Sequence, residues 1–175
     1  VELARDQYAL LANWHNIAVR EYLHAHPTTD ENLGSIGASL RPKLGKREVL
    51  KAVAVLERLK LISKDSKGRW RPTERLLTTS PEVSDLAARD HHQAMLGLAK
   101  EALDSFTGEE RYFRAITGSF SQEVYQSVVE EINRCRTRIL EMIQSDRGDR
   151  LTVYHIGFHL FPLEEPAKQK KGEQK

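Results

Sequence analysis

The chain has 175 residues, of which 39% are hydrophobic and 30% charged, and its net charge is +2. This composition is typical of a soluble globular protein with one domain or two small ones, and no apolar run approaches the ~20 residues that cross a bilayer. We therefore expect no membrane partner. The single cysteine, Cys135, cannot form an internal disulfide, which favours a reducing cytoplasmic location.

The charge is unevenly distributed along the chain. Residues 1–40 carry a net −3 and residues 76–166 a net −6, whereas residues 41–75 hold twelve Lys/Arg against four Asp/Glu, a net +8. Such asymmetry indicates an anionic partner for the middle segment.

Three helices are predicted in the first third of the chain. Apolar residues recur at helical spacing over residues 8–25, and Pro27 ends that pattern. A short second helix is predicted over residues 32–40 and is stopped by Pro42. A third runs over residues 46–60, with an apolar inner face and a basic outer face.

Two short strands are predicted next, over residues 61–64 and 69–72, because the four residues between them have the composition of a turn. Helix, short helix, longer basic helix and hairpin, in that order, are the pattern of a winged helix-turn-helix. The sequence therefore predicts a winged helix-turn-helix domain over residues 1–78. Trp14 and Trp70 are expected to pack in its core and against its wing.

A smaller helix-strand-helix-strand domain is predicted over residues 79–163, so the fold class is α+β. Ser80, Pro81 and Glu82 offer an N-cap, a first-turn proline and an acid at the start of a helix that continues to about Phe106.

The two strands of this second domain are expected at residues 112–120 and 151–161, on either side of a helix over residues 121–145. If they lie parallel in one sheet, that helix is a right-handed crossover, but the topology stays open. Its apolar positions from Val124 to Met142 either pack within the same domain, the favoured use, or seal a dimer. Residues 164–175 are predicted to form a disordered basic tail.

DNA-binding residues are predicted on the third helix and on the wing, because the major groove admits one helix whose exposed side chains reach base edges. The candidates are Lys46, Arg47, Lys51, Arg58, Lys64, Lys67, Arg69 and Arg71. Arg47 is the candidate for a base contact, since arginine pairs bidentately with guanine, whereas lysines more often approach phosphates. The alternative is that these cations only decorate exposed faces.

The other residue groups of the sequence give little indication of a metal, phosphate or catalytic site. On a predicted strand, His155 and His159 would lie about 13 Å apart, too far to share one metal ion. Gly34 and Gly37 lack the lysine of a phosphate loop and instead allow close helix packing. Because no nucleophile elbow, carboxylate pair or Cys–His arrangement is present, we expect no metal, no cofactor and no enzymatic activity.

Several short segments together resemble one bacterial family, a domain of unknown function (DUF4423) whose members are presumed regulators. They are Trp14 with Ile17, Arg20 and Glu21; Leu40-Arg41-Pro42; Leu59 to Ile62; His92 to Leu96; Glu110-Arg111 with Ile116-Thr117; and Val153-Tyr154 before Phe161-Pro162-Leu163. The resemblance implies a winged-helix first half, an α+β second half and no established activity. The family commonly has glycine where this chain has Lys60, which leaves the end of the third helix open.

Two functions follow from these expectations. The first is a transcription regulator that binds double-stranded DNA through its basic module, in which a two-fold homodimer would read half-sites about one DNA turn apart. The second is a protein-interaction scaffold in which the same winged fold presents its charged face to an acidic protein partner.

Overall fold

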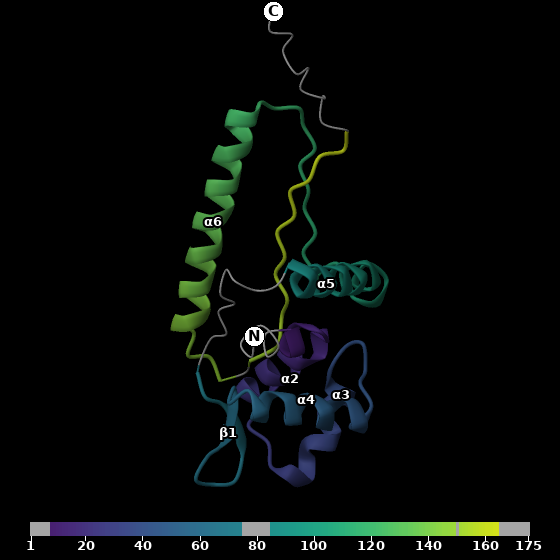
Figure 1. Cartoon of the computed structure of the whole chain (residues 1–175), viewed down its shortest axis with the longest axis vertical. Coiled ribbons are helices and arrows are strands. Elements are labelled where there is room, and N and C mark those ends of the chain that lie inside the picture. Colours follow the sequence, from purple (N-terminus) through teal and green to yellow (C-terminus); the bar gives the residue numbers. More distant parts are fainter. Residues whose placement is uncertain (1–7, 75–84, 150, 165–175) are drawn as a thin grey trace, which may run out of the picture.

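The computed structural model describes residues 8–74, 85–149 and 151–164. In chain order the elements are a helical turn over residues 8–11, α2 (Trp14–Ala25), the 3-10 helix η1 (Asp30–Ser35), α3 (Ile36–Ser39), α4 (Lys46–Arg58), β1 (Ile62–Lys64), β2 (Trp70–Pro72), α5 (Asp85–Ser105) and α6 (Gln122–Ser145). The fold is α+β, with a two-stranded antiparallel sheet at the edge of the group formed by α2, α3 and α4 (Figure 1). No helix in the described ranges is long and apolar enough to span a membrane.

The first helix is interrupted, so the prediction of one continuous helix over residues 8–25 is wrong. Asn16 explains the break, because its buried side-chain amide donates to the carbonyls of Ala9 at 2.9 Å and Leu10 at 3.2 Å. These carbonyls end the turn at residues 8–11 and would otherwise lack a helical partner. A side chain from the first turn of α2 therefore caps the preceding turn.

The second predicted helix is present as two short consecutive helices, the 3-10 helix η1 and the α-helix α3. The third is confirmed as α4, whose inner face buries Val49, Ala52, Val53 and Leu56. It ends at Arg58 rather than at residue 60. Lys60 has a φ of 58°, in the left-handed region that commonly terminates helices.

The hairpin pairs β1 with β2 so that Ser63 lies opposite Arg71. Trp70 joins the hairpin to the rest of the module in two ways. Its backbone N–H donates to the Thr28 carbonyl at 2.9 Å, and its indole Nε1–H donates to Asp30 Oδ1 at 2.7 Å. Because Trp70 is only 5% exposed, the prediction that it packs the hairpin onto the core is confirmed.

One apolar core joins these elements. Its buried members are Leu10, Val19, Leu23, Leu33, Ile36, Leu40, Val49, Ala52, Val53, Leu56, Ile62 and Trp70. Arg20 of α2 is fully buried beside this core, paired with Glu21, and it donates to the Glu74 carbonyl at 2.5 Å. The guanidinium therefore ties α2 to the chain that leaves the hairpin.

Both long helices of the second half are confirmed. α5 contacts α2, and its cap predicted at residues 80–82 lies outside the described residues. The Arg41 guanidinium lies 5.4 Å from the ring centroid of Phe106, just beyond the end of α5. α6 begins after Ser121, whose hydroxyl accepts the Val124 N–H at 3.3 Å.

The strands predicted at residues 112–120 and 151–161 are not formed in the described part of the chain. Both segments run as extended chain in the same direction, and α6 runs back between their ends (Figure 1). Within the described residues neither segment makes a backbone–backbone hydrogen bond. The helix-strand-helix-strand prediction is therefore wrong in its strands, because a strand requires a partner strand as well as a local pattern.

α6 is only partly covered by the rest of the described chain. None of its residues is buried against the described part of the protein, and Val124 and Met142, at either end of its apolar stripe, are exposed. The middle of the stripe, at Val128, Ile132, Cys135 and Ile139, is half-buried, so the favoured expectation of burial within its own domain is met only in part. Residues 165–175, most of the predicted tail, lie outside the described residues.

Candidate nucleic-acid interface

The outer face of α4 carries four of the eight predicted DNA-binding residues. Lys46, Arg47, Lys51 and Arg58 are all exposed; the last three lie opposite the buried apolar stripe, and Lys46 lies at its edge. None of the four forms an ion pair with another described residue. Their charges are therefore available to a partner outside the molecule.

The start of α4 is fixed by contacts to its backbone. The Gly45 N–H donates to Glu48 Oε2 at 2.7 Å, which places a carboxylate over the first turn and satisfies one free donor. Glu48 is thus occupied within the helix. The capping contact therefore fixes the backbone of the turn that carries Lys46 and Arg47.

Two glycines bring α3 close to that turn. A Cβ on Gly37 would lie 2.1 Å from the Leu44 carbonyl oxygen, and the Leu44 N–H donates to the Gly37 carbonyl at 3.0 Å. A Cβ on Gly34 would lie 3.1 Å from Lys46 Cδ, so the lysine stem lies along this glycine. The expectation that these glycines allow close packing is confirmed.

The hairpin tip is organised by one carboxylate, that of Asp65. It accepts the backbone N–H groups of Lys67 at 2.9 Å and Arg69 at 3.0 Å, and it pairs with the guanidinium groups of Arg69 and Arg71, each at 2.9 Å. The backbone N–H of Arg69 is the largest of the causes that hold the pKa of Asp65 well below its usual range. The carboxylate stays ionised and partly neutralises both arginines.

Lys64 is also occupied within the molecule. Its ammonium pairs with Asp30 Oδ2 at 2.5 Å and lies 4.9 Å from the ring centroid of Trp70. The hydrogen bond from Lys64, followed by that from Trp70, lowers the pKa of Asp30. This aspartate therefore fixes a hairpin cation to η1.

The eight candidates thus fall into two groups. Lys67 at the hairpin tip joins the four α4 cations as a side chain without an ion pair among the described residues, whereas Lys64, Arg69 and Arg71 are paired internally. The sequence-based reasoning missed the two aspartates that make these pairs. It also missed Lys43, which is exposed in the loop before α4 and could have been found from its place between Pro42 and the basic helix.

The histidines lie differently from their predicted spacing. A Cβ on Gly157 would lie 3.3 Å from His155 Nε2 and 3.0 Å from His159 Nε2, so the two imidazoles converge over the glycine. The spacing of about 13 Å applies to the backbone and neglects this convergence. In the described ranges, no group of three or more His, Cys, Asp or Glu residues is placed to hold a metal ion.

Two imidazoles of this region are held in the neutral form. Burial, followed by the neighbouring His92 and His155, lowers the pKa of His91. Burial, followed by His159 and His92, lowers the pKa of His155. These repulsions between imidazoles show that α5 and the segment that follows α6 lie near each other.

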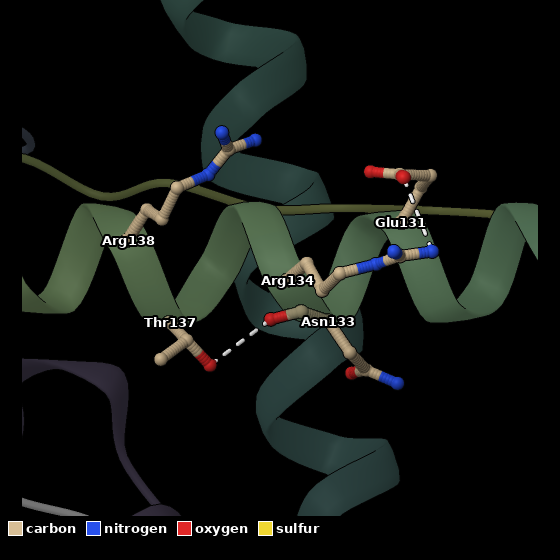
Figure 2. A pocket seen from close by; sticks show the side chains of 5 residues that line it. All are labelled: Glu131, Asn133, Arg134, Thr137 and Arg138. Atoms are coloured by element: carbon tan, nitrogen blue, oxygen red, sulfur yellow. Dashed lines mark hydrogen bonds and ion pairs between the residues drawn. The ribbon is translucent and has the colours of Figure 1, made fainter.

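An open pocket lies along α6 (Figure 2). Its lining residues all come from this one helix and are exposed: Glu131, Asn133, Arg134, Thr137 and Arg138. Arg134 pairs with Glu131 at 3.1 Å, and the Thr137 hydroxyl donates to the Asn133 carbonyl at 3.1 Å. The pocket is open to solvent, and several of its polar groups bond to one another. It therefore does not offer an enclosed binding site.

The profile of one protein family, described as a domain of unknown function (DUF4423), matches residues 1–163. No curated protein and no solved structure matches the chain.

Proposed function

We propose that this chain, which belongs to the DUF4423 family, is a DNA-binding transcription regulator that reads duplex DNA through α4 and the β1–β2 hairpin. The observation that carries the proposal is the unpaired basic face of α4, formed by Lys46, Arg47, Lys51 and Arg58. A helix of 13 residues is about 20 Å long and fits the major groove, which is roughly 12 Å wide.

The order of elements supports a winged helix-turn-helix arrangement. α2 packs on α4, η1 and α3 form the short middle helix, and the hairpin follows α4 directly. In that arrangement α4 is the recognition helix and the hairpin is the wing, which lies along the adjacent backbone or minor groove.

The side chains divide by chemistry. Arg47, in the first turn of α4, is the base-reading residue, because its planar guanidinium can pair with guanine O6 and N7. Lys46, Lys51 and Arg58 contact phosphates, and Lys67 does so from the wing tip. These four phosphate contacts predict a slope of log affinity on log salt of about −3.6, at −0.9 per neutralised phosphate.

The test is fluorescence anisotropy of a labelled random-sequence duplex across a salt series. We compare Lys51→Ala/Arg58→Ala, which removes two phosphate contacts, with a matched control, Arg136→Ala/Arg138→Ala, which removes two exposed cations from α6. At 0.1 M salt the α4 variant should bind roughly 60-fold more weakly, and its slope should be shallower by about 1.8. The control should bind like the parent. Equal loss in both variants, or no binding by the parent at low salt, would refute the proposal.

A second function, a scaffold that binds an acidic protein, is favoured by one observation. Leu50 lies on the same outer face of α4 and is 42% exposed, and an apolar side chain amid cations suits a protein surface as well as a groove. In that case the parent would show little affinity for duplex DNA at any salt concentration. The same anisotropy series therefore separates the two functions.

A further inference from the structure

The two extended segments of the second half share one open apolar face. In both segments large apolar side chains stand at even-numbered positions, which a strand places on one side, and Phe113 and Phe161 are the exposed apolar residues at odd positions. The exposed residues at even-numbered positions are Tyr112, Ile116, Phe120, Tyr154, Ile156 and Phe158, with exposures from 40% at Phe158 to 99% at Ile116.

The opposite side of the second segment carries two exposed histidines. His155 and His159 alternate with the apolar residues, and their imidazoles converge over Gly157. His155 lies near enough to His92 of α5 for their positive charges to repel each other. The exposed apolar side chains Tyr154, Ile156 and Phe158 lie on the other side of the segment.

We propose that a second copy of this chain covers this face, and that residues 112–120 and 151–161 of the two copies pair into one shared sheet. Neither segment makes a backbone–backbone hydrogen bond within the described residues, so both offer free strand edges. A sheet needs about three strands, or a packed helix, to be stable. One chain provides two segments, whereas two copies provide four.

The exposed area matches what a stable dimer needs. At about 200 Å² for a fully exposed side chain of this size, the six residues expose roughly 800 Å² per copy. The largest apolar patch on an ordinary monomer is about 300–600 Å², and a standard interface buries about 800 Å² from each partner.

The chemistry of the face favours a copy of itself over a charged partner. The only Lys, Arg, Asp or Glu in the two segments is Arg114, whose guanidinium already lies 4.6 Å from the ring centroid of Tyr112. Pairing with a second copy therefore brings few like charges close together. A two-fold arrangement places the same residues on both sides of the dimer interface. The incompletely buried apolar stripe of α6 supplies the layer that covers the sheet.

The test is sedimentation equilibrium of the full chain, together with hydrogen–deuterium exchange. The parent should sediment at twice its 20.0 kDa mass, with a dissociation constant below about 1 µM. Ile116→Lys/Ile156→Lys should sediment at 20.0 kDa with unchanged helical circular dichroism. The control Tyr8→Lys/Leu50→Lys makes the same exchange at two exposed apolar residues of the first module and should remain dimeric.

Exchange measurements on the parent keep the proposal testable even if the lysine variant fails to fold. Amides of residues 112–120 and 151–161 should be protected in the dimer and should become exposed as dilution dissociates it. A parent that is monomeric at all concentrations overturns the proposal. A dimer in which these amides exchange freely overturns it as well.

Discussion

Gly37→Ala tests whether the close approach between α3 and Leu44 sets the geometry of the first module. The added Cβ would lie 2.1 Å from the Leu44 carbonyl oxygen, whereas an ordinary carbon–oxygen contact is about 3.3 Å. The obstacle is backbone, and the Leu44 N–H is itself bonded to the Gly37 carbonyl at 3.0 Å. The clash therefore cannot be relieved by rotating a side chain.

The magnitude follows from overpacking of a tight site. Forced backbone shifts cost about 1–3 kcal/mol, and this contact lies at the upper end because the peptide must move by about 1 Å. We expect the free energy of unfolding to fall by about 2–3 kcal/mol, which lowers the melting temperature of a module this size by roughly 8–24 °C. Urea unfolding followed by tryptophan fluorescence measures the change, with buried Trp70 as the reporter.

Gly34→Ala is the matched control, since the same atom is added one turn earlier. Its Cβ would meet only the flexible stem of Lys46, at 3.1 Å. We expect a change below about 1 kcal/mol, since alanine also favours helix formation by a similar amount. If Gly37→Ala and Gly34→Ala unfold at the same urea concentration, the reasoning from the Leu44 contact is wrong.

Three further changes probe other features. Lys60→Gly should raise the free energy of unfolding by about 0.5–1 kcal/mol, because it removes left-handed strain at a φ of 58°; a drop in melting temperature would contradict this. Asp65→Asn keeps a turn acceptor but frees the charges of Arg69 and Arg71, so duplex DNA should bind more tightly, with a steeper salt slope by anisotropy; unchanged binding would show that the wing arginines do not face DNA. The lowered pKa of His91 means that the unfolded chain takes up protons first as the pH falls through 6.5, so stability should decrease between pH 7.5 and 5.5. In urea titrations at both pH values, His91→Gln should reduce that decrease, and an unchanged pH dependence would count against the neutral imidazole.

The helices could be predicted from the sequence because their signals are local. The spacing of Val49, Ala52, Val53 and Leu56 predicts α4 without reference to any other element, and it also places the basic residues on the opposite face. The hairpin was predictable for the same reason, from turn-forming residues between two short strands.

What could not be predicted depends on residues far apart in the chain. Lys64 pairs with Asp30, which lies 34 positions earlier, so the internal neutralisation of the wing leaves no trace in a local pattern. The break after residue 11 depends on the side chain of Asn16 rather than on helix propensity. The two missing strands have suitable composition, but pairing is a property of two segments rather than of one.

The bond between Trp70 and Thr28 also orders events during synthesis. At about 5–20 residues per second, a ribosome takes roughly 2–8 s to add the 42 residues that separate them. Until then α2 and α4 have been synthesised without the indole that closes their core, and the module cannot yet fold as a cooperative unit. The hairpin is therefore the closing step of folding at the ribosome, and a pause in translation before residue 70 would prolong exposure of the unfinished core.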